Sequence, residues 1–300
     1  MNWIVKQTTA PIVLPVSLKE MLASASVSSS FSTTLTADAS PTDTSISVAN
    51  TSGLTAGQTI TIGDEFGVIT AIDSLDLTIT PALPKAVSSG DAVTFSNENA
   101  SLLAALQAAV SLVESYLNRA LIAQTFTYQS DGFPASKIPW WDGVKQISQQ
   151  AFAAQSFIEL PRPPLRSISS VKYYDLDNNL TLFASSNYFV DTLAEPGRII
   201  LNYSSSWPIN VRAAAATEII YVAGYGSDRA DVPSAIREAI KLQANYMLNA
   251  SPDAVVEERL LGEATIKFDS FDNKQASGFY SASLTPTVRS LISGFKVFYL

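Results

Sequence analysis

The sequence predicts an α+β fold in which two long amphipathic helices form the core and β-rich sequence lies before and between them. The first observation is residues 99–123, where apolar residues recur every three or four positions along one helical face. The second is residues 233–249, which repeat that spacing. The third is a two-residue alternation of apolar and polar residues in residues 31–96 and 125–222, as expected for half-buried strands.

The first long helix has a defined apolar face and polar residues suited to its ends. Asn97 or Asn99 can cap its start, and Arg119 suits the negative end of the helix dipole. The residues of the apolar face are Leu102, Leu106, Ala109, Val110, Val113, Leu117 and Leu121.

Shorter helices are expected near both ends of the chain. Ser17 and Glu20 form the pattern of a capping box, which predicts a helix that begins at Leu18 and ends near Ala25. A last helix is expected between residues 285 and 294.

The second long helix also has boundary residues. Asp231 is its expected N-cap, Pro233 suits its first position, and Pro252 lies beyond its end. Its predicted buried face carries Ile236, Ala239, Ile240, Tyr246 and Met247.

Residues 31–96 predict a small β-barrel or roll. Expected strands lie at 44–48, 58–62, 66–72, 75–79 and 92–95, with turn residues between them. Asp64, Glu65, Asp73 and Asp76 have the oxygen ligands that calcium prefers, but they lack the alternating-ligand loop of such sites. Ordinary turn residues are the preferred interpretation.

Residues 125–222 predict a second set of strands, at 126–128, 156–160, 169–174, 188–191, 198–201 and 218–222, with a hairpin turn at 175–179. A long loop at 132–154 contains Trp140 and Trp141. Adjacent tryptophans can stack on sugars or bases, but the loop lacks basic residues or a carboxylate cluster around them. A protein interface or self-packing is therefore favoured.

The composition excludes several classes of chemistry. The chain of 300 residues contains no cysteine and no histidine, which rules out disulfides, Cys/His zinc sites and every triad that uses histidine. We therefore assign no catalytic, cofactor-binding or metal-binding residue and expect no enzyme. Gly224 and Gly226 form only half of a nucleotide-binding loop, so a turn is expected there.

The charge balance argues against binding to nucleic acid or membrane. The net charge is −8, and the 19 basic residues are scattered. Only 15% of residues are charged, which suits packing against other protein chains. Pro11 and Pro15 interrupt the apolar N-terminal region, so no signal peptide is expected, and no window reaches the roughly 18 uninterrupted apolar residues of a membrane span.

An ordered set of motifs resembles the head–tail connector (adaptor) proteins of tailed bacteriophages and gene transfer agents. The resemblance covers residues 1–25 and 98–250. In chain order, the motifs are PVSLKE (15–20), ESYLNRALIAQTF (114–126), DGFP (131–134), IELPRPPLRSISSVKYYD (158–175), YFVDT (188–192), PGRIIL (196–201), YVAGYG (221–226) and VPSAIREAI (232–240).

The resemblance implies a small helical bundle with a β-rich insertion between its two long helices. The connector core would comprise residues 1–25 and 98–124 as its first part and 223–300 as its second part, with 125–222 as the insertion. Residues 26–97 would form an additional β-module that departs from the family pattern and projects from the ring.

The implied function is structural. The chain would be a virion protein of the neck, made in the bacterial host cytoplasm, and about twelve copies would form a ring beneath the portal. This ring would extend the DNA channel and attach the tail or a stopper (tail-completion) protein. Double-stranded DNA would pass through without sequence-specific binding, and we hypothesise that acidic residues around the channel let it slide.

The expected contact residues lie in the tryptophan loop and at the apolar C-terminus. So apolar a terminus needs burial, either in the core of its own chain or against a neighbouring subunit. We hypothesise that residues 284–300 form an inter-subunit or portal contact. The predicted interaction residues are Trp140, Trp141, Leu284, Val288, Leu291, Phe295, Phe298, Tyr299 and Leu300.

Two other functions fit parts of the sequence. A tail or baseplate adhesin would use Trp140 and Trp141 as a sugar-binding platform, although it leaves the long helices unexplained. A glycosidase would need two carboxylates across a cleft, for which Asp131 and Asp142 are the candidates.

Overall fold

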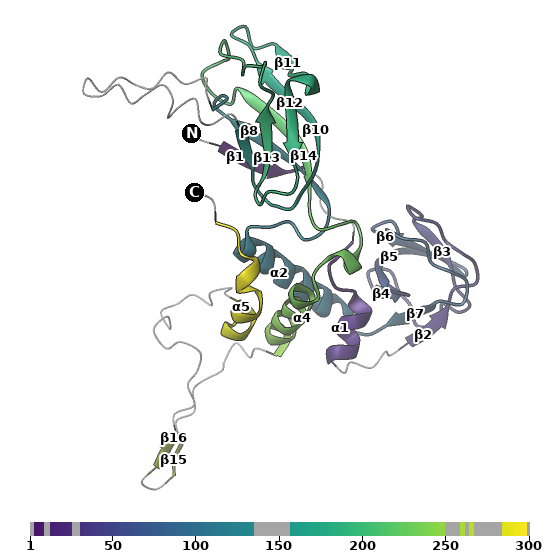
Figure 1. Cartoon of the computed structure of the whole chain (residues 1–300). Helices are drawn as coiled ribbons and strands as arrows, with labels where there is room; N and C mark the ends of the chain where they lie inside the picture. The colour runs from purple at the N-terminus through teal and green to yellow at the C-terminus, as the bar shows by residue number, and fades with distance from the viewer. Residues whose placement is uncertain are drawn as a thin grey trace.

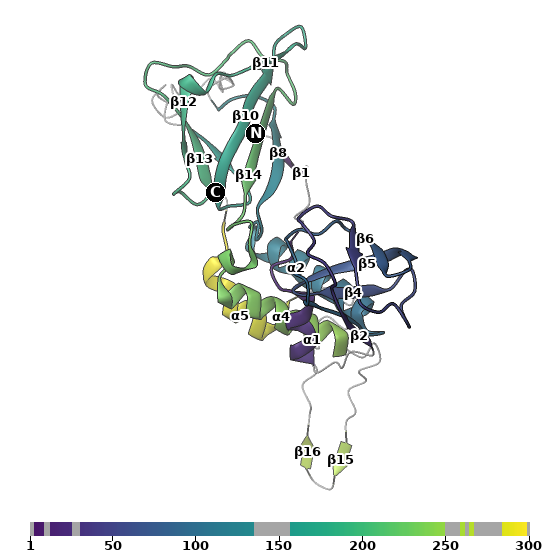
Figure 2. The same cartoon turned by 90° about the vertical axis from the view of Figure 1, so that its right-hand side faces the viewer.

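The computed structural model describes residues 3–8, 13–25, 31–134, 157–249, 259–261, 264–266 and 284–298. Three units are visible in Figure 1, a group of helices and two β-rich units that adjoin it. One β-rich unit is formed largely by residues 124–223 and the other by residues 31–95. Figure 2 shows the same three units after a quarter turn.

Residues 31–95 form a six-stranded antiparallel sheet in the order β2-β7-β4-β5-β6-β3. The strands are β2 (Phe31–Thr34), β3 (Ser45–Ser47), β4 (Thr59–Ile62), β5 (Glu65–Asp73), β6 (Asp76–Thr80) and β7 (Ala92–Phe95). A bridge between Leu35 and Val48 joins the chain just after the two edge strands, so the sheet closes on itself. Its interior is apolar, with Ile60, Ile62 and Leu77 fully buried. This region is the barrel that the alternation predicted, and we call it the β-module.

The second β-rich unit packs a five-stranded sheet against a three-stranded sheet. The first has the order β1-β8-β14-β10-β11 and the second the order β12-β13-β9. The five-stranded sheet contains β1 (Trp3–Gln7), β8 (Gln124–Ser130), β10 (Leu165–Tyr174), β11 (Leu180–Leu182) and β14 (Thr217–Ala223). The other contains β9 (Phe157–Leu160), β12 (Tyr188–Asp191) and β13 (Gly197–Leu201). We call this unit the β-sandwich.

Aromatic residues dominate the core of the β-sandwich. Phe133 stacks on Trp207 with ring centroids 4.8 Å apart, and Phe126 stacks on Tyr221 at 5.6 Å. The buried Tyr221 hydroxyl donates to the carbonyl of Pro161 at 2.7 Å, so its polar end is satisfied. β8 and β14 alternate strictly between buried and half-buried residues, as strands with one covered face do.

Four α-helices pack together, namely α1 (Leu18–Ala25), α2 (Asn99–Leu117), α4 (Ser234–Asn249) and α5 (Pro286–Ile292). Leu106 and Val113 of α2 and Ile236 and Ile240 of α4 are fully buried in their shared cluster. Short 3₁₀ helices lie at η1 (Ser185–Asn187), η2 (Arg229–Asp231) and η3 (Ser293–Phe295). A separate hairpin pairs β15 (Arg259–Leu261) with β16 (Ala264–Ile266).

Several local predictions are confirmed. The capping box forms, since the Glu20 amide donates to Ser17 Oγ at 3.1 Å and the Ser17 amide donates to Glu20 Oε2 at 3.1 Å. The predicted turn at 175–179 joins β10 to β11, and the amide of Asp175 donates to the carbonyl of Asn179 at 3.1 Å.

The first long helix ends earlier than the expected residue 123. Asn118 follows α2 in the left-handed conformation, with φ 55°, which terminates the helix. The N-cap is Glu98, whose side chain makes no capping hydrogen bond, and not Asn97 or Asn99. Among the described residues α2 is the one helix long and apolar enough to cross a membrane. Its apolar face packs against α4 in the helical cluster.

The predicted fold class, a small helical bundle with a β-rich insertion and an extra β-module, is wrong. The described residues are mostly antiparallel β-sheet, and their four α-helices are short, from 7 to 19 residues. The alternation located most of the strands, but the continuous helical periodicity of two segments was given more weight than many short strands spread along the chain. The helices were therefore overestimated as the organising element.

Strand β1 was not predicted from the sequence. Residues 3–7 pair with β8 in register from Trp3 opposite Ser130 to Gln7 opposite Phe126. Nothing local to the N-terminal sequence predicted this strand, because its partner lies more than 100 residues away.

Candidate interaction surfaces

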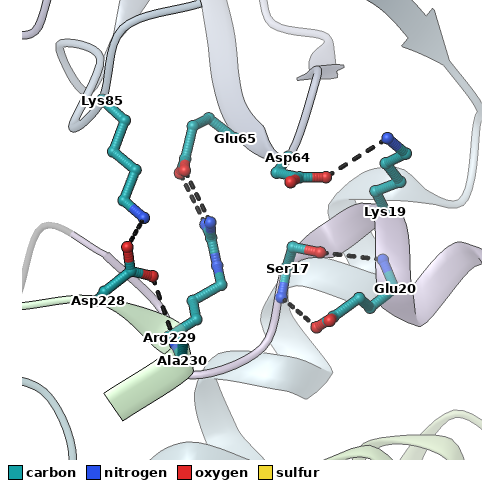
Figure 3. A network of polar contacts seen from close by, with 9 residues as sticks. All are labelled: Ser17, Lys19, Glu20, Asp64, Glu65, Lys85, Asp228, Arg229 and Ala230. Atoms are coloured by element: carbon teal, nitrogen blue, oxygen red, sulfur yellow. Dashed lines mark hydrogen bonds and ion pairs between the residues drawn. The ribbon is translucent and has the colours of Figure 1, made fainter. Parts of the chain in front are cut away.

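A buried ion pair joins the β-module to the helical part of the chain (Figure 3). Arg229 of η2 donates through both terminal nitrogens to Glu65 at the start of β5, each at 2.7 Å. The side chains are only 10% and 3% exposed. Two parallel hydrogen bonds between planar groups fix both distance and orientation. This pair therefore holds the β-module in a defined position relative to η2.

The 3₁₀ turn that carries Arg229 has its own capping box. The Asp228 carboxylate accepts from the amide of Ala230 at 3.3 Å, and the Asp228 amide donates to Asp231 Oδ2 at 3.0 Å. Lys85 of the β-module pairs with Asp228, and this hydrogen bond holds the pKa of the Asp228 carboxyl below its ordinary value. The capping box and the Lys85 contact therefore place the Arg229 side chain.

A buried amide makes a further contact at this joint. Asn99, the first residue of α2, donates through Nδ2 to the carbonyl of Thr59 in β4 at 2.9 Å. The sequence suggested Asn99 as a helix cap, but its fully buried side chain instead connects the helix to the β-module.

Three of the four carboxylates weighed as calcium ligands have other partners. Glu65 binds Arg229, and Asp64 lies 3.4 Å from the ammonium of the exposed Lys19. Asp76 accepts a hydrogen bond from Ser47 across the β3–β6 pair. The described part of the chain contains no group of three His, Cys, Asp or Glu residues placed to hold a metal.

A second joint connects the end of α2 to the β-sandwich and to the C-terminal segment. Arg119 donates through both terminal nitrogens to the Glu195 carboxylate, with one contact at 2.9 Å, and its Nε donates to the carbonyl of Phe295 at 2.5 Å. The Val297 amide donates to the carbonyl of Leu117 at 3.1 Å. The Val297 contact satisfies one of the last carbonyls of α2, which lack partners within the helix.

Glu114 lies beside this joint in a pocket of about 190 Å³ lined also by Arg119, Gln124 and Arg162. Its Oε1 accepts from the Leu121 amide at 2.9 Å and from Gln124 Nε2 at 3.0 Å. Burial raises the pKa of the Glu114 carboxyl, although these hydrogen bonds and nearby Arg162 act in the opposite direction.

The predicted interaction residues at the C-terminus divide into two groups. Leu284 and Val288 are 4% and 1% exposed and belong to the helical core of their own chain. Phe295 is half-buried against that core. Leu291 and Phe298 are exposed, the latter by 72%, and remain available for a partner.

The other predicted residues lie outside the described part of the chain. These are Trp140, Trp141, Tyr299 and Leu300. Of the two carboxylates weighed for glycoside hydrolysis, Asp142 also lies outside it, while Asp131 accepts from the Ala215 amide at 3.2 Å.

Gly224 and Gly226 lie where a side chain has no room, and Gly226 forms a parallel bridge with Ile122. Gly224 has φ 135°, and a Cβ there would lie 2.5 Å from the backbone of Ile122. A Cβ on Gly226 would lie 1.8 Å from Asp231 Oδ2. Both positions exclude a side chain because other groups occupy the space.

The β-sandwich exposes more large apolar side chains than the sequence analysis identified. They are Ile4, Leu176, Leu180, Leu182, Phe189, Leu193, Tyr203 and Ile209, all between 46% and 107% exposed. Leu180 and Leu182 follow the hairpin turn at 175–179. Leucines around an exposed turn were the sequence signal that could have indicated this surface. Exposed apolar residues grouped on one unit indicate protein interaction surfaces.

These features define a β-rich scaffold made of several units joined by a buried ion pair, Arg229–Glu65, and a partly exposed one, Arg119–Glu195. A scan against protein-family models found no match, and neither did a search of curated proteins. Among solved structures, the chain is similar to a protein in the neck of an empty gene transfer agent (GTA) particle computed with C6 symmetry. The identity is 14%, the TM-score is 0.54, and the match covers 99% of this chain and 97% of the other. The chain therefore shares the fold of a neck protein.

Two weaker likenesses come from related particles. A chain in the virion of a native GTA particle matches with 16% identity and a TM-score of 0.45, over 69% of this chain and 81% of the other. A chain in the neck of a native GTA particle computed with C12 symmetry matches with 19% identity and a TM-score of 0.41, over 67% and 84%.

Proposed function

We propose that this chain is a structural protein of a virion neck, a head–tail connector that forms a ring beneath the portal. The observation that carries the proposal is the fold likeness to a GTA neck protein over 99% of this chain. That span includes the β-module, so the proposal accounts for the whole chain and not only for the part with connector-like motifs.

The joints between units suit such a role. A connector transmits force between head and tail, so its units must hold fixed positions. The bidentate pairs Arg229–Glu65 and Arg119–Glu195 each link segments far apart in the sequence. Such pairs specify orientation as well as contact.

The proposed role of each segment follows the units of the fold. Residues 1–25, 98–124 and 223–300 form the connector core, except that β1 adds a strand to the β-sandwich. Residues 125–222 form an insertion within the core, and residues 26–97 form an added module that projects outward. Leu291 and Phe298 are proposed contacts of the core with the portal or a neighbouring copy, because both are exposed apolar side chains.

The remaining partners follow from the same role. The ring would receive the portal above and a stopper or tail-completion protein below, with DNA in its channel. We propose that acidic residues face the channel, so that phosphates find no basic partner and DNA slides during ejection; the net charge of −8 per copy supports this.

The decisive experiment is electron microscopy of particles from producing cells in which this gene is disrupted. We expect free tails beside tailless heads, some of them emptied of DNA, because the joint between the two assemblies is missing. Complementation with the intact gene should restore complete particles.

Complete but non-infectious particles would overturn the proposal. That result would point to an adhesin, and variants of Trp140 and Trp141 tested on a glycan array would then be the first measurement.

A further inference from the structure

The five-stranded sheet of the β-sandwich has two open edges that run in the same direction. All four strand pairs in the order β1-β8-β14-β10-β11 are antiparallel. An odd number of alternating strands leaves the first and last strands parallel to each other. Figure 2 shows β10, β14, β8 and β1 following one another across the sheet. Within the described residues, no strand pairs with the outer side of β1 or β11.

One row of residues crosses the whole sheet from edge to edge. Ile4 lies opposite Gln129, Gln129 opposite Glu218, Glu218 opposite Lys172, and Lys172 opposite Leu182. Residues directly opposite each other point to the same face, so these five side chains share one face of the sheet.

The ends of this row differ from its middle. Ile4 is 69% exposed and Leu182 is 64% exposed, whereas the central Lys172 and Glu218 are half-buried and form an ion pair at 3.7 Å. Native proteins commonly protect open edges with charged residues, yet this row ends in an apolar side chain at both edges. Both edge strands therefore carry an exposed apolar side chain in the same row of the sheet.

We propose that β11 of one copy pairs in parallel with β1 of the next copy, so that the five-stranded sheets form one continuous sheet around the ring. Leu182 of one copy then lies beside Ile4 of its neighbour. This inference rests on the proposed function, because it assumes that copies are arranged in a ring.

A ring requires a heterologous contact, which this pairing supplies. Rotation about an axis roughly along the strands preserves strand direction, so neighbouring edges meet in parallel. Each copy uses two different edges, which is the heterologous contact that closes a ring, and no edge stays open. A two-fold dimer would instead pair β1 with β1 or β11 with β11 in antiparallel fashion and would leave the other edges exposed.

Cysteine cross-linking tests the pairing directly, because the natural chain contains no cysteine. The double variant I4C/L182C is expressed in place of the natural chain, and purified particles are oxidised mildly. Within one chain the two sites are separated by four strand spacings, about 19 Å, which a disulfide cannot span. When β11 of one copy pairs with β1 of the next, position 182 of the first copy and position 4 of the second lie within the range of a disulfide.

We expect a ladder of bands at multiples of 32.1 kDa on a non-reducing gel, which collapses to one band on reduction. The matched control is I4C/L75C, since Leu75 is also an exposed apolar residue, 47% exposed, but belongs to the β-module. The control should give no ladder.

The outcomes separate the inference from the proposed function. Particles that contain the chain and complete tails but give no ladder overturn the edge pairing and leave the connector role intact. Particles that never contain the chain overturn both. Bands that stop at the dimer indicate a two-fold contact and overturn the continuous sheet.

A second measurement does not depend on disulfide chemistry. L182D introduces a charge at the proposed contact, and L75D is its control. Both sites are exposed, so the thermal unfolding of the isolated chain should be unchanged for both. Only L182D should reduce the yield of tailed particles, by tenfold or more. Equal yields for the two variants would overturn the inference.

Discussion

Arg229 and Glu65 are 164 positions apart in the sequence, yet they form a bidentate, almost fully buried ion pair. The pair connects the turn before α4 to the first residue of β5. It therefore holds the β-module against the helices, although this module has a hydrophobic core of its own.

Removing one member of this pair should be costly. R229M leaves the Glu65 carboxylate buried without its main partner, which typically costs about 3–5 kcal/mol. Urea denaturation should show the loss, and limited proteolysis should show faster cleavage near residues 31–97. The control is K19M, because Lys19 and Asp64 are both more than half exposed and such pairs contribute about 0–1 kcal/mol. Equal effects of R229M and K19M would contradict the role given to the buried pair.

G226A should disturb the capping box of the turn that carries Arg229. The new Cβ would lie 1.8 Å from Asp231 Oδ2 and 2.4 Å from Asp231 Cβ, so Asp231 must move and its hydrogen bond to the Asp228 amide breaks. Loss of a helix cap costs about 1 kcal/mol, and thermal unfolding should reveal it. G294A is the control, since a Cβ there meets nothing within 4 Å. A destabilisation by G294A as large as that of G226A would rule out this explanation.

Glu114 should make the protein less stable as the pH rises. Burial raises the pKa of its carboxyl in the folded chain above the ordinary value of 4.5, so the folded state binds the proton more tightly than the unfolded state. The free energy of unfolding then falls as the pH rises between those two pKa values. E114Q keeps an oxygen acceptor for Leu121 and Gln124 but carries no charge. Its melting temperature at pH 7 should exceed that of the natural chain, and the two should converge near pH 4. A lower melting temperature at pH 7 would contradict this account.

Glu195 should behave in the opposite way and provides the control. Its hydrogen bond with Arg119 lowers the pKa of its carboxyl below 4.5 in the folded chain. The stabilisation is present above the ordinary pKa and is lost as the pH falls through the folded value. E195Q should therefore lower the melting temperature at pH 7, with a smaller difference at pH 3. The effect should be modest because the Glu195 side chain is 43% exposed. If E195Q shows the same pH profile as E114Q, the assignment is wrong.

Two neighbouring C-terminal residues should separate folding from assembly. Val297 is 6% exposed and its amide completes the end of α2, so V297D should lower the melting temperature markedly. Phe298 is 72% exposed, so F298D should change stability by less than about 0.5 kcal/mol. Under the proposed function F298D should nevertheless reduce the attachment of tails to heads, as counted by electron microscopy. Normal particles from F298D would remove this residue from the proposed contacts.

The local sequence predicted several elements well. The Ser17–Glu20 capping box located the start of α1, and the alternating residues located the strands of the β-module. Each of these depends on neighbours within a few positions. The ordered motifs also indicated the connector family, in agreement with the fold likeness to a neck protein.

Other features had no local signal. β1 forms only because β8 offers an edge, and Arg229 and Glu65 look like ordinary surface charges until the fold buries them. The predicted helical bundle was wrong because the strands, pairing into sheets of five, three and six strands, outweigh the helices in the described residues.

The sequence by itself determined the caps, the turns and the apolar faces of helices and strands, because these follow from residue types at short spacing. It also excluded histidine and cysteine chemistry outright. Only the tertiary structure decided which strands pair, which charges are buried at the joints, and which apolar side chains remain exposed at the edges of the β-sandwich. Those outcomes depend on contacts between different segments of the chain, from neighbouring strands to Glu65 and Arg229, which are 164 positions apart, and their energies appear only when the chain is folded.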